Sequence, residues 1–290
     1  MSHLLNRILL ATDGSGDARL AALAATSLSE KAGAELHVVH AWQSVPHPVI
    51  DPDYYEEGAR RTLEEETSFV SGAGGTVAEA HLVAGAPVDV ILDLAAGIAA
   101  DLLVVGSRGN GPIARLLLGS VSEGIVHHAA CPVLVVRGVE GSWPPERVII
   151  GDDDSQAAKK AGELALGIAS LFGAGTILVR AYPEFPEADP VARAVDPRAV
   201  DDALRRAERD LHERAEELGR PFGRSPRIGV AAGDAALALL HEAHDGDEAR
   251  ALIAVGSRGL GPAGRLRLGS VSTRVIRAAA GPVLVCPDAG

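Results

Sequence analysis

A glycine-rich stretch occurs twice in this chain of 290 residues, once from Gly106 and again from Gly256. When the two glycines are aligned, 19 of the 33 positions compared are identical and no gap is needed. Nearer the start of each copy, RILLATDGS from Arg7 aligns with RVIIGDDDS from Arg147. A repeat of this length means that one structural unit is encoded twice, so the chain is expected to fold as two similar domains.

The repeat also places the domain boundary. Each copy has a length of about 140 to 150 residues, which is the usual size of one domain. A segment rich in Gly and Pro lies between the copies, and such residues are typical of turns and connections. We therefore expect one domain at residues 1–140, a linker at 141–145 and a second domain at 146–290.

Apolar runs that indicate strands alternate with helical periodicity in both copies. In the first copy the expected strands lie at residues 7–12, 35–42, 76–85, 101–106 and 132–136. In the second copy one clear helical stripe is formed by Val200, Leu204, Ala207, Leu211 and Leu218. Alternating strands and helices predict a parallel sheet covered on both faces, because each parallel crossover requires a helix. The expected fold class is α/β: two tandem doubly wound, Rossmann-like domains, each a five-stranded, mainly parallel sheet with about four helices.

Composition excludes several classes of partner. The formal net charge is −12, so the field of the protein repels phosphate backbones and anionic lipids, and we expect no nucleic-acid partner. No apolar run approaches the roughly 18 residues of a membrane span, and no signal peptide is recognisable, so we expect a cytoplasmic protein without membrane contact. The two cysteines, Cys131 and Cys286, have different offsets in the two copies and indicate neither a disulfide framework nor a metal site.

The duplicated loop is a candidate phosphate site. It follows the fourth expected strand of each copy, and open α/β sheets bind ligands outside the carboxyl ends of their strands. Gly106 and Gly109 permit close backbone approach, and Gly119 precedes a helix whose first N–H groups favour an anion. The loop also carries side chains that suit a phosphate: Arg108, Ser120 and Ser122. The same glycines suit a tight turn and a helix cap without any ligand, and the residues alone leave that alternative open.

The loop matches neither of the two common nucleotide fingerprints. A P-loop requires Gly-x-x-x-x-Gly-Lys-Ser/Thr, and neither loop contains a lysine. The dinucleotide fingerprint follows the first strand of a sheet, whereas this loop follows the fourth. A second candidate group is the aspartate after the first strand, which is Asp13 in one copy and Asp153 in the other. Its carboxylate suits a ribose or a base amino group, but it equally suits a turn or a helix cap.

Taken together, these residues resemble a known family. The spacing of Gly106, Gly109, Gly119 and Ser120 matches the Gly-2x-Gly-9x-Gly-Ser/Thr motif of the ATP-binding branch of the universal stress protein family. The motif is matched again by Gly256, Gly259, Gly269 and Ser270. ATDGS, LHVVH, GAP and CPVLVV also occur in the order typical of the family. The chain therefore resembles a tandem universal stress protein along nearly its whole length.

The resemblance implies an adenine nucleotide, expected to be ATP with Mg²⁺ as a candidate companion, over the strand ends of each copy. In the first copy the implied contacts are Asp13, Val38, Gly106, Gly109, Gly119, Ser120, Val121 and Ser122. In the second copy they are Asp153, Leu178, Gly256, Gly259, Gly269, Ser270, Val271 and Ser272. Two arginines join these sets as candidates for binding phosphate, Arg108 and Arg258. The resemblance also implies pairing of the two domains through their last strands, and it is compatible with a homodimer.

The second copy departs from this pattern. Leu178 replaces the valine of the second strand, and GDDDS places three carboxylates where the first copy has one. Additional negative charge repels a triphosphate unless a cation or an arginine compensates for it. Nucleotide binding is therefore a firmer expectation for the first copy than for the second.

No catalytic base recurs in both copies. The three histidines nearest the first candidate site are replaced in the second copy, His40 by Arg180, His127 by Arg277 and His128 by Ala278. A base that each site required would be expected in both, so we interpret these histidines as surface or helix-end residues. The sequence favours a non-enzymatic, ATP-binding regulator of a stress response. The alternatives are a slow ATPase or nucleotidyl-transfer enzyme, and an interaction module whose glycine loops are only turns.

Overall fold

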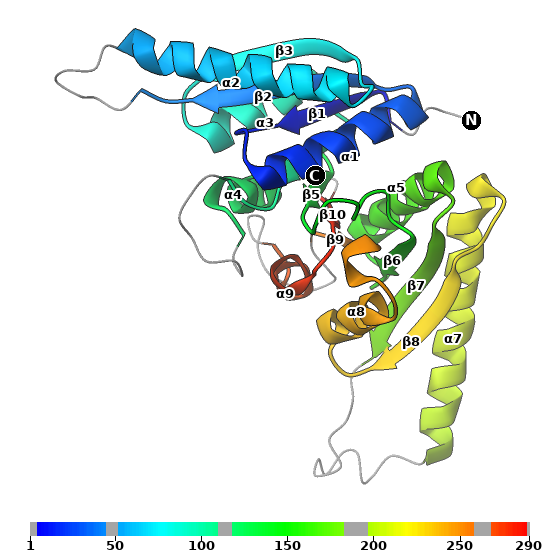
Figure 1. The fold of residues 1–290 in the computed structure, drawn as a ribbon. Coiled ribbons are helices and arrows are strands. Elements are labelled where there is room, and N and C mark those ends of the chain that lie inside the picture. Colours follow the sequence, from blue (N-terminus) through cyan, green and yellow to red (C-terminus); the bar gives the residue numbers. More distant parts are fainter. Residues whose placement is uncertain (1–4, 45–51, 110–117, 183–196, 258–267, 289–290) are drawn as a thin grey trace.

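The computed structural model describes residues 5–44, 52–109, 118–182, 197–257 and 268–288. Its first half contains β1 (Arg7–Ala11), α1 (Gly16–Ala32), β2 (Glu35–Trp42), α2 (Pro52–Gly72), β3 (Val77–Ala84), α3 (Pro87–Gly97), β4 (Leu102–Gly106), α4 (Ser120–His128) and β5 (Val133–Val136). The second half repeats this order with β6 (Arg147–Gly151), α5 (Gln156–Phe172), β7 (Gly175–Tyr182), α7 (Pro197–Gly219), β8 (Arg227–Ala232), α8 (Ala235–His244), β9 (Ala251–Gly256), α9 (Ser270–Ala278) and β10 (Val283–Cys286) (Figure 1).

The strands form one ten-stranded sheet in the order β3-β2-β1-β4-β5-β10-β9-β6-β7-β8. Within each half, neighbouring strands are parallel, which confirms the expected α/β fold class. The two halves meet at β5 and β10, which pair antiparallel with Leu134 opposite Leu284. The two five-stranded sheets are therefore continuous with one another.

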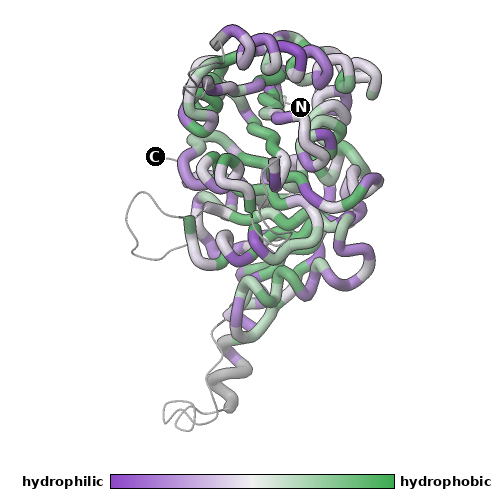
Figure 2. The backbone as a smooth tube through the Cα atoms, turned by 60° about the vertical axis from the view of Figure 1, so that its left-hand side comes forward, coloured by the Kyte–Doolittle hydropathy of each residue, from purple (hydrophilic) through white to green (hydrophobic). Residues whose placement is uncertain are grey.

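Helices cover both faces of the sheet. α1, α2, α5 and α7 pack on one face, and α3, α4, α8 and α9 pack on the other (Figure 1). Ile8, Leu9 and Leu10 of β1 are all fully buried and alternate between the two layers, as expected for a strand covered on both sides. Figure 2 shows the apolar strands inside and hydrophilic stretches along the outer helices. None of the described helices combines the length and the apolar character needed to cross a membrane.

The ends of the first helix of each half follow from matching residues. The Ser15 hydroxyl accepts a hydrogen bond from the backbone N–H of Ala18, and Gly33 ends α1 with φ of 68°. Ser155 and Gly173 cap α5 in the same way. Both devices are standard helix signals. The burial of Val200, in the expected α7 stripe, lies outside what the structure describes. Leu204 of that stripe is not buried but 41% exposed, because the first part of α7 projects beyond the sheet (Figure 1).

The segment between the halves is packed against both of them. The indole Nε1 of Trp143 donates to the Ser27 hydroxyl of α1 at 2.7 Å, and its ring meets Phe172 of α5 edge-on at 5.6 Å. Arg137, just after β5, donates to the carbonyl of Ala279 in the second half at 2.9 Å. The junction is therefore held by side chains as well as by the shared sheet.

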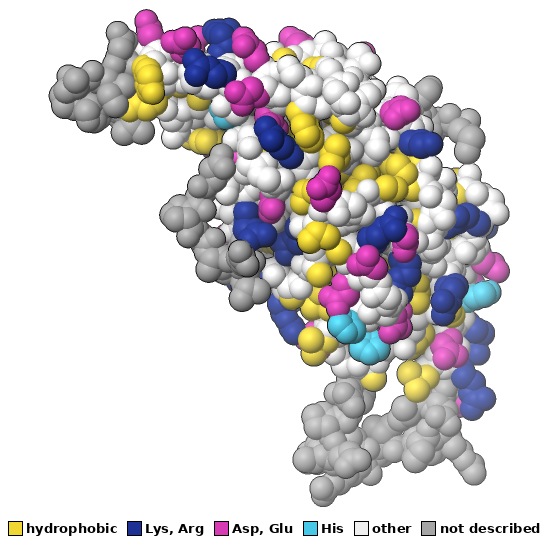
Figure 3. All heavy atoms as spheres, in the orientation of Figure 1, with side chains coloured by type: hydrophobic (Ala, Val, Ile, Leu, Met, Phe, Trp, Pro, Cys, Tyr) yellow, Lys and Arg dark blue, Asp and Glu magenta, His cyan; other side chains and the backbone are white. Residues whose placement is uncertain are grey.

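On the face drawn in Figure 3, acidic and basic side chains are intermixed.

Candidate functional site

A cavity of about 560 Å³ lies outside the carboxyl ends of β1 and β4. The strand order reverses between these two strands, and such a switch point is where open α/β sheets bind ligands. The volume is typical of small-molecule sites, which range over about 300–1,000 Å³. The lining residues are Ala11, Thr12, Asp13, Ser15, Gly16, Asp17, Ala18, Ala41, Pro87, Ile91, Val105, Gly106, Arg108, Gly109, Gly119, Ser120, Val121, Ser122 and Ile125.

The turn after β1 forms one wall of this cavity. Asp13 accepts a hydrogen bond from the backbone N–H of Ser15 through Oδ1 at 3.0 Å, and Gly14 has φ of 75°. The Ser15 hydroxyl donates to the carbonyl of Arg108 at 3.1 Å. This bond ties the turn to the loop after β4, so the two predicted parts of the site lie against each other.

Two glycines of the motif lie very close to the first turn and helix of the domain. A Cβ on Gly106 would lie 2.7 Å from the backbone nitrogen of Ala18, so only glycine lets β4 pass the start of α1. A Cβ on Gly109 would lie 2.2 Å from Oδ2 of Asp13. The loop backbone therefore touches the carboxylate that the sequence singled out. Among the described residues, a Cβ on Gly119 would meet nothing closer than 3.4 Å, so packing against this part of the chain does not demand glycine there.

The loop closes on the first turn of α4. The backbone N–H of Gly119 donates to the carbonyl of Ser107 at 2.8 Å, and the buried Ser122 hydroxyl donates to the carbonyl of Gly106 at 2.7 Å. No side chain in the described part of the chain caps α4. Ser120 and Val121 line the cavity at this helix end, where free N–H groups and the helix dipole favour an anion.

The charged groups at the cavity form a cluster around Asp17. Its Oδ2 accepts hydrogen bonds from the Ser107 hydroxyl at 2.6 Å and from Nε of Arg108 at 3.3 Å. Burial lowers the pKa of the nearby Arg137, and the charge of Arg108 lowers it further, whereas Asp17 raises it. Asp17 is thus neutralised by a partner that also offers positive charge to the cavity.

Val38, a predicted nucleotide contact, is not among the residues that line the cavity. Val38 is fully buried on the face of β2 that packs against α1 and α2. Ala41, three residues further along β2, lines the cavity instead. Residues that the sequence analysis did not name also line it, among them Thr12, Asp17 and Ile91. Their position depends on which face each strand and helix turns to the switch point.

Polar residues behind the cavity hold the turn after β1. The Thr12 hydroxyl donates to Oε2 of the buried Glu66 at 2.9 Å, and Arg19 pairs with the other oxygen of Glu66 at 3.1 Å. Nδ1 of His40 lies 2.8 Å from the carbonyl of Thr12. His40 is therefore half-buried and engaged with the backbone, which differs from the expected surface position. His127 and His128 lie in the last turn of α4, as expected.

The loop of the second half closes in the same way. The Ser272 hydroxyl donates to the carbonyl of Gly256 at 2.6 Å, and the N–H of Gly269 donates to the carbonyl of Ser257 at 2.7 Å. Ser270 begins α9, and Val271 follows it in the first turn. Arg258 and Gly259 fall outside the described residues. Leu178, like Val38, is fully buried in the core.

The three aspartates of the second half have separate surroundings. The side chain of Asp152 is 1% exposed and pairs with Arg180 and with Arg214. Burial lowers the pKa of Arg180, but the hydrogen bond and the charge of Asp152 outweigh it, so the pKa is raised. Asp153 accepts from the backbone N–H of Ser155 at 3.1 Å. Asp154 is exposed, with φ of 67°. One of the three carboxylates is thus neutralised inside the domain.

The two cysteines form no disulfide bond, and their thiols have little reactivity. Both are free. Burial raises the pKa of Cys131 to about 11 and that of Cys286 to about 12. Because the thiolate is the reactive form, both thiols are inert at neutral pH.

Comparison with known proteins relates both halves of the chain to one family. A sequence model of the Universal stress protein family matches residues 5–137 and again residues 145–287. A universal stress protein of Thermus aquaticus is 41% identical over 138 residues, which are 46% of this chain and all of that protein. A universal stress protein of Mycobacterium bovis is 29% identical over 261 residues, covering 86% of this chain and 85% of the relative.

Solved structures show the same architecture. The crystal structure of a universal stress protein from Archaeoglobus fulgidus superposes with a TM-score of 0.69 at 24% identity and covers 100% of both chains. At that identity the likeness concerns the fold, and it extends over the paired arrangement of two domains.

Proposed function

Because the chain belongs to the universal stress protein family along both halves, we propose that it binds an adenine nucleotide, ATP, in the cavity between β1 and β4. We further propose that the bound nucleotide makes the protein a regulator in a stress response. Both proposals start from the motif residues that the cavity brings together.

The observation that carries the proposal is the contact between the two parts of the motif. Asp13 and Gly109 belong to segments far apart in the sequence, and a Cβ on Gly109 would lie 2.2 Å from the Asp13 carboxylate. Asp13 supplies an acceptor for a ribose hydroxyl or an amino group. The first turn of α4 supplies N–H donors for phosphates. One elongated ligand with a nucleoside at one end and phosphates at the other would use both.

A regulatory role rather than turnover is supported by the groups around the cavity. His40 is adjacent in sequence to Ala41, which lines the cavity. Its ring nitrogen contacts the backbone carbonyl of Thr12, and His40 is not among the lining residues. The second half carries Arg180 at the matching position, paired with Asp152. A general base at each site would need a free nitrogen near the bound phosphates.

For the second domain we propose weaker binding. Its loop closes through the same two hydrogen bonds, at Gly256 and Gly269, which supports a phosphate site. Asp153 and the exposed Asp154 add carboxylates at the turn after β6. Arg180 lies 3.7 Å from Asp154 and compensates for part of this charge, and the remainder repels a triphosphate. Divalent cations would reduce this repulsion, so Mg²⁺ is expected to favour binding at this site more than at the first.

The test uses Gly119→Val in the full chain. Gly119 lines the cavity where the phosphates are proposed to bind, so a valine adds bulk to that wall, and among the described atoms the nearest to its Cβ would lie at 3.4 Å. We expect the Kd for ATP at the first site, measured by isothermal titration calorimetry, to rise at least tenfold with little change in Tm. Gly97→Ala is the control, because nothing lies within 4 Å of its Cβ. Unchanged ATP affinity in Gly119→Val would overturn the assignment of this loop.

Hydrolysis is tested on the same two proteins. Incubation with Mg-ATP, followed by chromatography of the nucleotides, is expected to show no steady release of ADP or AMP. Turnover by the wild type that Gly119→Val abolishes would replace the regulator with an ATPase. A parallel titration with EDTA in place of Mg²⁺ separates nucleotide binding from cation binding.

A further inference from the structure

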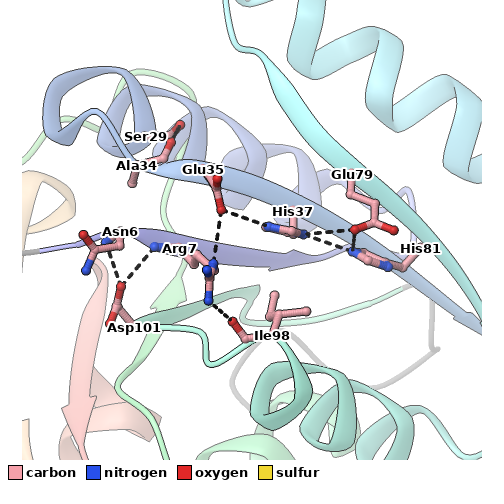
Figure 4. A network of polar contacts seen from close by, with 10 residues as sticks. All are labelled: Asn6, Arg7, Ser29, Ala34, Glu35, His37, Glu79, His81, Ile98 and Asp101. Atoms are coloured by element: carbon pink, nitrogen blue, oxygen red, sulfur yellow. Dashed lines mark hydrogen bonds and ion pairs between the residues drawn. The ribbon is translucent and has the colours of Figure 1, made fainter.

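Two histidines and a glutamate converge at the opposite end of the first domain from the cavity. His37 belongs to β2, and Glu79 and His81 belong to β3, the edge strand of the sheet. The parallel register places His37 opposite Glu79 and Val39 opposite His81, so all three side chains leave the same face (Figure 4). We propose that His37, Glu79 and His81 bind a divalent transition-metal ion of the zinc class.

The three candidate ligand atoms are spaced as a metal requires. Nδ1 of His37 lies 3.1 Å from Nε2 of His81. Oε2 of Glu79 lies 4.0 Å from the first of these atoms and 3.8 Å from the second. A point equidistant from the three atoms lies about 2.1 Å from each, which is the length of a zinc–nitrogen or zinc–oxygen bond. This point lies in the plane of the three atoms, so a tetrahedral ion requires the exposed Glu79 carboxylate to move closer to the two rings.

The surroundings of His37 favour the metal-binding tautomer. Its Nε2 is buried and has no hydrogen-bond partner among the described residues, and it faces Oε2 of Glu35 at 3.8 Å. A metal on Nδ1 places the proton on Nε2, and a small approach of the exposed Glu35 carboxylate from 3.8 Å would let it accept that proton in a hydrogen bond. A carboxylate behind a ligating histidine is the usual arrangement that orients the ring. Glu35 is in turn held by Nε of Arg7 at 3.1 Å.

The two histidine side chains are largely buried, whereas the glutamate side chain is open to solvent. The side chains of His37 and His81 are 10% and 13% exposed, whereas that of Glu79 is 63% exposed. Burial lowers the pKa of His81, Glu79 raises it, and His37 lowers it. The net effect lowers the pKa of His81. Two imidazoles and one carboxylate, with a position left for water, form a donor set that suits zinc and its neighbours in the first transition row.

The fold does not require these residues. In the second half, the corresponding register pairs Ile177 with Arg227 and Val179 with Gly229. An aliphatic residue, an arginine and a glycine thus occupy the places of the three candidate ligands. The same strands form with either set, so packing of the sheet does not explain two histidines and a glutamate together.

The experiment is a Zn²⁺ titration of the untagged, chelator-treated full chain against a competing indicator. We expect one tight site per chain. His37→Ile combined with His81→Gly installs the residues of the second half and should weaken this site at least 100-fold. His127→Ala combined with His128→Ala removes two histidines of the same domain from outside the cluster and should leave it intact. Circular dichroism and Tm establish that each variant is folded.

Two single variants keep the proposal testable if the double variant does not fold. Glu79→Arg, on the exposed edge, should weaken Zn²⁺ binding at least tenfold. Glu35→Gln should weaken it by roughly 10–100-fold, as is usual for a residue that orients a ligating histidine. Nitrogen NMR of the wild type should show Zn²⁺ fixing the proton of His37 on Nε2. Equal Zn²⁺ affinity in the wild type and the cluster variants would overturn the site, and so would loss of binding in the His127, His128 control.

Discussion

Each half has a buried carboxylate beside its first strand, but the carboxylate comes from a different element in each half. In the first half the acid is Glu66 of α2, which accepts from the Thr12 hydroxyl at 2.9 Å. In the second half the acid is Asp152 in the turn, and its partners Arg180 and Arg214 come from β7 and α7. A buried charge must be paired to be tolerated. The acid lies in the helix in the first half and in the turn in the second, and in both places it is paired with an arginine, so the fold is preserved while the charge beneath the candidate site changes.

Asp152→Asn removes this charge, so that Arg180 and Arg214 keep only their ion pairs with the more exposed Asp154, at 3.7 Å, and Glu217, at 3.5 Å. Breaking a buried pair at one partner typically costs about 3–5 kcal/mol. Because the arginine side chains are 15% and 12% exposed, we expect the low end, about 3 kcal/mol, in the free energy of unfolding from urea denaturation. Asp154→Asn is the matched control in the same turn and should change it by less than about 0.5 kcal/mol. Equal effects of the two substitutions would contradict the burial argument.

The elements that join the halves are the strand pair β5 and β10 and the segment around Trp143. β5 and β10 are short, but every residue in them is buried. The Trp143 ring contacts both halves: it donates a hydrogen bond to Ser27 of α1 and packs against Phe172 of α5. We propose that residues 141–145 connect the domains as a packed segment, which differs from a free linker because its indole contacts both sides.

Trp143→Ala tests this junction. We expect a loss of about 2 kcal/mol in the free energy of unfolding, below the roughly 3–5 kcal/mol of a fully buried tryptophan, because the ring is only half-buried. Ser27→Ala leaves the ring in place but removes the acceptor of the indole hydrogen bond and the bond that the Ser27 hydroxyl donates to the carbonyl of Ala24, and it should cost about 1 kcal/mol. If both variants lost the same amount in urea denaturation, the ring contact with α5 would contribute nothing.

Across the whole molecule, the repeat and the periodicity were enough to predict the α/β class and the parallel halves. They were not enough to identify the cavity wall at β2, because both faces of a doubly covered strand are apolar and LHVVHAW does not show that Ala41 rather than Val38 reaches the cavity. The cluster of His37 and His81 was also not predictable. It depends on the β2–β3 register, which shifts between Leu36 and His37.

The central claim is that the cavity between β1 and β4 holds an adenine nucleotide. Its most direct test is to denature freshly purified protein, separate the released small molecules by ion-exchange chromatography and count the nucleotide per chain, with Gly119→Val prepared in parallel. We predict at least one adenine nucleotide per wild-type chain, approaching two where the second domain is also filled, and a lower count in the variant. No nucleotide in the wild type, together with no change in Tm on adding Mg-ATP, would contradict the claim and leave the repeated loop as a turn.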